Sequence, residues 1–374
     1  MFRFANNFKI LIVFFMFIFS SSKTFSDDIK EQHYKYTVIG ASGDIGSALV
    51  KQLDKNNEIY QAVFRTQNSK KSYEKRSDNI ILEKNYLILE NLFDTKSIEN
   101  IISNTESVYI LMAALGLDNS KASNCKDVAI NALLPIKIFK IAESISPDKR
   151  IIFGSSHVIY KLLSNIEVND WIVKSLDFIN ENERVLLSVK NENNLSDFSK
   201  ILLEQNPLPN DVSAYAISKL LVESYLSQSQ LKNFLGVRIS SSYGKGSLSG
   251  RSVQKMIEAN LQNKLITSHQ EARDYLDLED LALILYKSSF FKDLPKNIFI
   301  DAASGEIVDP QYIWNTILKY SDNKSLNINF VGTPKIQVPQ DTKWSKKLLG
   351  KDFISFDEGL KKQFEWMHDM TQSH

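Results

Sequence analysis

Tyr215 and Lys219 stand four residues apart at the start of a run, residues 214–226, whose pattern predicts a helix. Side chains at positions i and i+4 share one face of a helix, so the phenol and the ammonium would lie side by side. A nearby ammonium favours the phenolate and lowers the pKa of tyrosine, which lets the phenol exchange a proton near neutral pH. The spacing therefore predicts an acid–base pair.

A second Tyr-x-x-x-Lys spacing, Tyr320 and Lys324, shows that the spacing alone proves little. No strand that ends in hydroxyl side chains comes shortly before this copy, and we interpret it as a chance occurrence. The first copy is preceded by a predicted strand, Arg150–Phe153, which is followed by a glycine and two serines, Ser155 and Ser156. Ligands of open α/β sheets bind at the carboxyl ends of the strands.

A glycine-rich turn predicts a nucleotide site. The apolar strand Tyr36–Ile39 runs into three glycines spaced as GxxGxxG, and a predicted helix, Ile45–Asp54, follows. Such a turn lets the backbone approach a pyrophosphate without a Cβ in the way, and the helix N-terminus offers unpaired N–H groups. Only 13 glycines occur in 374 residues, so three within seven positions favour a functional turn. The residues predicted to hold a dinucleotide here are Gly40, Ser42, Gly43, Asp44, Ile45 and Gly46.

The next predicted strand, Tyr60–Arg65, bears on which dinucleotide is bound. An acidic residue about 20 positions after the turn would accept a hydrogen bond from the ribose 2′-hydroxyl of NAD. This chain has Arg65 at that place, and an arginine can pair bidentately with the 2′-phosphate of NADP. An arginine on the surface without a ligand is the alternative. NAD and NADP both stay open, and Arg65 favours NADP.

Further landmarks follow in order, and together they resemble the extended short-chain dehydrogenase/reductase family, the NAD-dependent epimerases and dehydratases that include the nucleotide-sugar epimerases. The landmarks are Asn91-Leu92-Phe93-Asp94, Leu111–Ala114, Asn131-Ala132, Val237–Ile239, Tyr243-Gly244, Arg273–Asp280 and the C-terminal stretch from Asp341 to Trp366. No single motif carries the resemblance; it rests on the order and the number of the motifs.

The resemblance implies a role for each landmark. The catalytic residues would be Tyr215, Lys219 and Ser156, which lies four residues before Tyr160, with Ser155 as the fallback. The cofactor site would be lined by the glycine turn together with Arg65, Asn91, Leu92, Met112, Ala113, Ala114, Tyr215 and Lys219. Ser156 and Arg273 would contact the substrate, which in this family is a nucleotide sugar.

Two reactions fit these residues. The motif set favours an NAD(P)-dependent nucleotide-sugar epimerase, which moves hydride and a proton at a sugar carbon. The alternative, which Arg65 favours, is an NADPH-dependent reductase of a 4-keto nucleotide sugar or another carbonyl. A non-catalytic dinucleotide sensor is a third interpretation, and the presence of all three catalytic residues argues against it. His157-Val158 stand where sugar dehydratases carry Asp-Glu, which argues against dehydration, and we interpret His157 as a packing or hydrogen-bonding residue.

The order of the predicted elements indicates an α/β fold, a Rossmann-type doubly wound parallel sheet with a smaller C-terminal substrate-binding domain. Residues 34–245 are predicted to bind the dinucleotide, with a further strand of the same sheet near 297–300, and residues 246–374 mainly to bind the substrate. The polar segment 161–211 breaks the pattern. We interpret it as a surface insertion, with a lid over the active site as the alternative.

Composition excludes other classes. The 45 basic and 44 acidic residues nearly cancel, which gives no support for nucleic acid as a partner. The single cysteine excludes an intramolecular disulfide, and the scattered histidines predict no metal site. Residues 1–30 contain an apolar run of the signal or anchor type, unless translation starts later. A cytoplasmic protein is predicted, with membrane contact only through that segment. The family resemblance implies a homodimer through the helices Asp127–Ser144 and Ala214–Leu231.

Overall fold

The computed structural model describes residues 32–372 apart from 78–79, 91, 114–119, 248–249, 323 and 325–327. The apolar segment at residues 1–30 lies outside the described residues, so its role stays a prediction. In the part of the chain that is described, no helix combines the length and the apolar character needed to cross a membrane.

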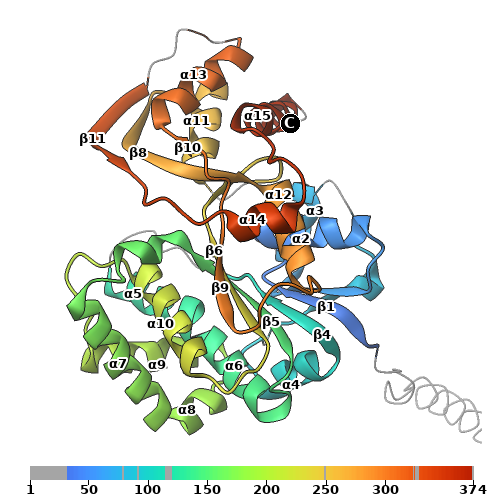
Figure 1. The fold of residues 1–374 in the computed structure, drawn as a ribbon, viewed down its shortest axis with the longest axis vertical. Helices are drawn as coiled ribbons and strands as arrows, with labels where there is room; N and C mark the ends of the chain where they lie inside the picture. Colours follow the sequence, from blue (N-terminus) through green and yellow to red (C-terminus); the bar gives the residue numbers. More distant parts are fainter. Residues whose placement is uncertain are drawn as a thin grey trace, which may run out of the picture. The chain divides into compact units, whose positions relative to one another are not determined.

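Seven parallel strands form one sheet in the order β3-β2-β1-β4-β5-β6-β9 (Figure 1). The strands are β1 (Tyr34–Ile39), β2 (Tyr60–Phe64), β3 (Tyr86–Ile88), β4 (Thr105–Ile110), β5 (Arg150–Ser156), β6 (Phe234–Ile239) and β9 (Ile298–Ala302). The four strands named in the sequence analysis are all present in this sheet, and the strand order confirms the Rossmann-type doubly wound fold. The strand order reverses between β1 and β4, so their carboxyl ends flank the crevice in which such folds bind ligands.

Side chains alternate across this sheet and build a core on each face. Val38 and Ile39 are both buried, yet they belong to different hydrophobic clusters because successive side chains of a strand point to opposite faces. The Val38 side is covered by α2 (Asp44–Lys55), α3 (Gln67–Ser77), α12 (Leu278–Ser288) and α14 (Lys343–Leu349). The Ile39 side is covered by α4 (Thr95–Ser103), α5 (Lys121–Val128), α6 (Leu134–Ile145) and α10 (Ala214–Gln228).

The single helix expected at Asp127–Ser144 is interrupted. A π-helical turn, Ala129–Leu133, joins α5 to α6. Pro135 has no N–H, so it cannot donate the usual helical hydrogen bond to the carbonyl of Asn131. The π turn is the local solution to that missing bond. It places Asn131 in a fully buried position facing the sheet core.

The segment 161–211 folds into three helices that belong to the main core. They are α7 (Ile166–Glu181), α8 (Glu183–Ser188) and α9 (Glu192–Gln205), and Figure 1 shows them beside α5, α6 and α10. Trp171 is 2% exposed and its indole N–H donates to the carbonyl of Asn206 at 2.9 Å. Lys137 of α6 is fully buried and donates to the carbonyls of Leu187 and Val189. The expected packing of the apolar residues is confirmed, but the segment is a structural layer and not a loose surface insertion.

This layer covers the surface through which a homodimer was expected. Every residue from Asn131 to Ala142 is buried, and so is most of α10 up to Leu226. Lys140 of α6 bonds Asn180 at 3.1 Å and Glu183 at 2.7 Å, so even its charged side chain is satisfied within the chain. A second copy could reach these two helices only by displacing α7–α9. These helices are largely buried by their own chain, and the expected homodimer stays a prediction.

A second, smaller sheet lies beside the carboxyl end of the large one. It contains β7 (Ser241–Tyr243), β8 (Ile266–Asp277), β10 (Ile307–Val308) and β11 (Ile328–Ile336), with α11 (Ser252–Leu261), α13 (Pro310–Tyr320) and α15 (Phe356–Gln372) against it. These elements share their own hydrophobic cluster, which includes Trp314 and Phe364. The boundary at residues 245–246 between two domains stays a prediction.

Candidate active site

The glycine turn has the shape that a pyrophosphate requires. Gly40 has φ +94°, and a Cβ there would lie 2.7 Å from the backbone nitrogen of Met112, so conformation and packing both demand glycine. A Cβ on Gly46 would lie 2.1 Å from the carbonyl oxygen of Gly40. Gly43 is different, because a Cβ added there would lie 3.5 Å from its nearest neighbour, an ordinary contact, and its φ is −75°. The described residues thus leave room for a side chain at position 43, and a glycine there fits the close approach of a ligand.

A cavity of about 440 Å³ extends from this turn across the ends of β1, β2 and β4. Its lining contains many residues predicted for the cofactor site: Gly40, Ser42, Gly43, Arg65, Leu92, Met112 and Ala113. Asn91 and Ala114 lie outside the described residues. The cavity lies where the strand order reverses. It is lined by apolar side chains and by the glycines of the turn, which suits a dinucleotide.

Asp44 and Ile45, also predicted for the cofactor site, turn away from this cavity. The Asp44 carboxylate pairs with Arg76 and accepts a hydrogen bond from the Ser247 hydroxyl at 2.8 Å. It thereby ties α2 to α3 and to the loop after β7. Ile45 lines the neighbouring cavity, described below. These partners engage the Asp44 carboxylate within the protein, and the predicted contact of Asp44 with the cofactor stays a prediction.

Arg65 lines the dinucleotide cavity as expected, but it has a partner that the sequence did not suggest. Its guanidinium lies 2.9 Å from the carboxylate of Glu192, at the start of α9. Lys126, which lines the same cavity, lies 3.5 Å from that carboxylate. Glu192 belongs to the inserted segment, and no sequence motif marks it.

Tyr215 and Ser156 meet at the carboxyl end of the large sheet. Ser156 is the last residue of β5, and Tyr215 lies in the first turn of α10. Both side chains line one cavity. Burial raises the pKa of Tyr215 above its usual value, while the Ser156 hydroxyl and the charge of Arg251 oppose this rise. The phenol is therefore protonated at neutral pH and ready to donate a proton.

Lys219 lies one turn further along α10 and is 1% exposed. Its ammonium donates to the Gly154 carbonyl at 2.9 Å and stands 5.9 Å from the centre of the Tyr215 ring. Burial lowers the pKa of Lys219 to about 7, although Glu223 opposes the shift. Burial is the largest cause of the pKa shift at both side chains, and the expectation that Lys219 lowers the pKa of Tyr215 stays a prediction.

The pKa of Lys219 predicts how stability changes with pH. The unfolded chain keeps this lysine protonated up to a pKa of about 10.5, whereas the folded chain releases the proton near pH 7. Between these values the unfolded state binds more protons, so Lys219 makes stability rise with pH. The urea midpoint of the wild type should rise from pH 7 to pH 9 relative to that of Lys219→Met. Parallel pH profiles for the two proteins would contradict the assignment.

Ser155, the fallback for the catalytic serine, has a structural role instead. Its hydroxyl donates to Glu223 of α10 at 2.6 Å, and Arg238 of β6 pairs with the same carboxylate at 2.8 Å. Arg238 also donates to the hydroxyl of Tyr160 at 3.1 Å. This buried network fixes α10 against β5 and β6, and so holds Tyr215 in register with Ser156.

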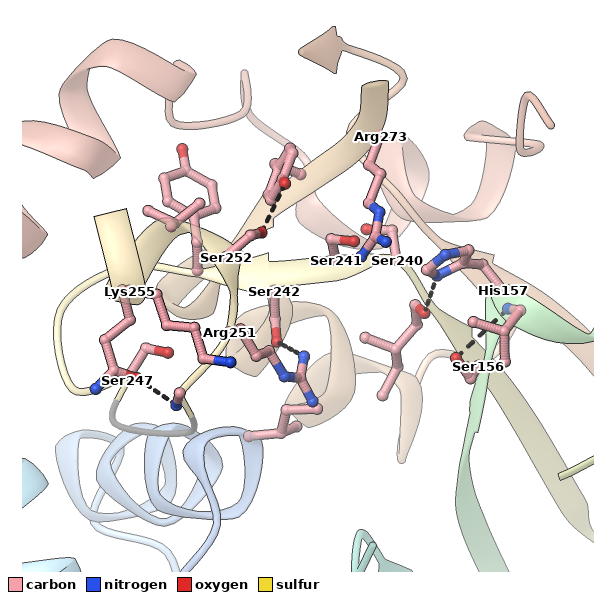
Figure 2. Close-up of a pocket in the computed structure, with 18 of the residues that line it drawn as sticks. Ser156, His157, Ser240, Ser241, Ser242, Ser247, Arg251, Ser252, Lys255 and Arg273 are labelled. Atoms are coloured by element: carbon pink, nitrogen blue, oxygen red, sulfur yellow. Dashed lines mark hydrogen bonds between the residues drawn. The ribbon is translucent and has the colours of Figure 1, made fainter. Parts of the chain in front are cut away.

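A second cavity, of about 390 Å³, adjoins these groups and carries three cations. Figure 2 shows Arg251 and Lys255 on one side, Ser156 and His157 on the other, and Arg273 above them. The sequence predicted Arg273 but missed Arg251 and Lys255. Serines line the space between them: Ser240, Ser241, Ser242, Ser247 and Ser252. The signal was available, since a run of serines at the end of β6 leads into a glycine-containing loop and an arginine.

His157 lines the same cavity and forms the hydrogen bond that was expected of it. Its Nδ1 lies 3.1 Å from the Ile239 carbonyl, and since a carbonyl only accepts, Nδ1 carries the proton. Burial lowers the pKa of His157 to about 4, with Arg273 and Lys161 acting in the same direction. The ring is neutral at pH 7, so it adds no charge to the cavity.

The chance interpretation of the second Tyr-x-x-x-Lys copy agrees with the structure. Tyr320 is the last residue of α13 and Lys324 lies beyond its end, so they do not share a helix face.

Asp274, the acidic residue next to Arg273, has a structural role. Asp274 accepts hydrogen bonds from the backbone N–H groups of Ser304 and Gly305.

Comparisons with known proteins bear on the family and the fold. The model of the NAD dependent epimerase/dehydratase family matches residues 36–175 and 192–289, and the gap between them falls within the inserted helices. A search of the curated proteins found no match.

Solved structures share the fold over most of their length. UDP-glucose 4-epimerase of Thermotoga maritima, in complex with UDP-glucose, has a TM-score of 0.65 at 18% identity, with 90% of this chain and 99% of that chain covered. The enzyme WbmG of Bordetella bronchiseptica, in complex with NAD and UDP, has a TM-score of 0.64 at 16% identity, with 91% and 96% covered. dTDP-glucose 4,6-dehydratase of Bacillus anthracis, in complex with NAD, has a TM-score of 0.64 at 14% identity, with 90% and 97% covered.

The family match spans well over half of the chain, and the strand order and the glycine turn agree with it. The protein therefore belongs to the NAD-dependent epimerase/dehydratase family, enzymes of the extended short-chain dehydrogenase/reductase type.

Proposed function

We propose that the protein is an NAD(P)-dependent epimerase of a nucleotide sugar. The observation that carries the proposal is the position of Tyr215 and Ser156, between the glycine turn and a cavity with three cations. Arginine and lysine side chains pair strongly with phosphate oxygens, so Arg251, Lys255 and Arg273 suit the diphosphate of such a substrate. The uncharged serines and His157 suit the hydroxyl groups of its sugar.

In this proposal, Tyr215 exchanges a proton with the sugar oxygen at the reacting carbon, and Ser156 hydrogen-bonds the same oxygen. The raised pKa of Tyr215 suits the step in which the phenol donates. Lys219 holds the end of β5 through the Gly154 carbonyl, and it would contact the ribose of a bound dinucleotide. The dinucleotide, when bound along the glycine turn, supplies the hydride chemistry.

The alternative is an NADPH-dependent reductase of a 4-keto nucleotide sugar or another carbonyl. Arg65 favours it because a guanidinium lines the adenosine end of the dinucleotide cavity. The ion pair of Arg65 with Glu192 weakens this argument, since that guanidinium already has a carboxylate partner. A non-catalytic dinucleotide sensor has the least support, because Ser156, Tyr215 and Lys219 lie together.

Native mass spectrometry of the protein purified without added cofactor separates the two reactions. An epimerase regenerates its cofactor in place, so we expect tightly retained NAD(H). A protein that is empty after purification and takes up NADPH in preference to NADH would support the reductase instead. Conversion of a panel of UDP- and dTDP-sugars, followed by the change of sugar configuration, then tests the epimerase directly.

A further inference from the structure

We propose that Glu192, in the inserted helices, makes the protein select NAD over NADP. This inference rests on the proposed function, because it requires a dinucleotide in the cavity along the glycine turn. In many dinucleotide-binding folds, the strand that follows the glycine turn recognises the ribose of the cofactor. In this protein, the inserted helices would take part in that recognition.

The position of Glu192 is the first observation. Its carboxylate lies 2.9 Å from the guanidinium of Arg65 and 3.5 Å from the ammonium of Lys126. Arg65 and Lys126 both line the dinucleotide cavity, from β2 and α5 respectively. Glu192 therefore lies beside two residues that line that cavity, near the end of β2.

The second observation is that β2 brings no acid of its own. In many folds of this kind, a carboxylate at the end of this strand accepts a hydrogen bond from the ribose 2′-hydroxyl of NAD. Here that place is taken by Arg65, and a carboxylate arrives from a residue 127 positions later in the chain. Glu192 can accept the hydrogen bond that β2 cannot.

The third observation is the balance of charge. Arg65 and Lys126 by themselves would attract a 2′-phosphate, which carries negative charge and strong acceptor oxygens. Glu192 already pairs with both cations, and its own charge would repel the phosphate. The 2′-hydroxyl of NAD is neutral, so the Glu192 carboxylate does not repel it.

The helix that carries Glu192 is held in place by the core. Asn191 caps α9 by accepting a hydrogen bond from the backbone N–H of Asn194. Leu195 and Phe198 of the same helix are buried against α5 and the π turn. A carboxylate in the first turn is also favourable for the helix dipole. Glu192 therefore has a defined place relative to Arg65.

The test compares Glu192→Gln with Glu167→Gln by isothermal titration of NAD and NADP. Both variants lose one negative charge from the first turn of an inserted helix, but Glu167 is exposed in α7, and the carboxylate that pairs with Arg65 and Lys126 is that of Glu192. We expect the wild type to bind NAD more tightly than NADP. Glu192→Gln should shift the ratio of the two Kd values toward NADP by roughly tenfold, since exposed charge pairs act modestly. Glu167→Gln should leave the ratio unchanged.

A double variant identifies the cation responsible. Adding Arg65→Gln to Glu192→Gln should remove most of the gained NADP affinity. A wild type that prefers NADP, or a ratio that Glu192→Gln leaves equal to that of Glu167→Gln, overturns the inference. Failure of the proposed function gives a different result: the panel of nucleotide sugars would show no change of sugar configuration, whereas the ratio of the two Kd values still tests Glu192.

Discussion

Replacing Tyr215 with phenylalanine is expected to lower kcat by roughly 10²- to 10⁴-fold, the usual contribution of a positioned acid or base. The substitution removes only the hydroxyl, which lines the same cavity as Ser156, and leaves the ring in the first turn of α10. The dinucleotide cavity is lined by other residues, so the Kd of NAD should stay close to the wild-type value. Turnover of nucleotide sugars and isothermal titration of NAD measure the two effects separately.

The matched control for this substitution is Tyr320→Phe. Tyr320 belongs to the second Tyr-x-x-x-Lys copy, at the end of α13 and away from both cavities, so turnover should not change. Retention of wild-type turnover by Tyr215→Phe would show that another group exchanges the proton. Loss of NAD binding in the same variant would show instead that the cofactor site had been disturbed.

Replacing Trp171 with alanine is expected to lower the free energy of unfolding by about 3–5 kcal/mol, the usual range for a buried tryptophan. The side chain lies in the hydrophobic cluster shared by α6 and α10, and its indole N–H bonds Asn206. The substitution leaves a cavity in the core and removes that bond. Urea unfolding measures the loss as a lower midpoint with an unchanged slope.

Val173 provides the control in the same helix. Its side chain is 58% exposed, so Val173→Ala should change stability by no more than about 0.5 kcal/mol. Equal, small effects of the two substitutions would mean that α7 is a loosely attached insertion. A large effect for Trp171→Ala alone confirms that the inserted helices are part of the core.

The sequence was sufficient for the sheet and for the nucleotide turn. The strands alternate with helices, and the local pattern of apolar residues identifies each strand without knowledge of its neighbours. The glycines could be interpreted from the chain alone because a turn is a local structure, and the requirement at Gly40 and Gly46 lies in adjacent backbone. Ser156, Tyr215 and Lys219 were identified by motifs with fixed spacing, and the structure brings the three side chains to one place.

Side-chain partners distant in the sequence were not predictable. Asp44 was assigned to the cofactor, but its partner Ser247 lies 203 residues away. Arg65 pairs with Glu192, which is marked by no motif, and the pKa of Lys219 depends on burial that only packing creates. Electrostatic effects act through space and depend on the local dielectric, so spacing along the chain could not give their size or even their sign.

The sequence by itself determined the fold class, the glycine turn and the catalytic candidates, because each of these depends on residues close together in the chain. The tertiary structure decided what the inserted segment does. Its polar composition favoured a surface insertion, but three helices cover α6 and α10. Only the folded chain shows that the Lys137 ammonium donates to the carbonyls of this layer and that Glu192 pairs with Arg65.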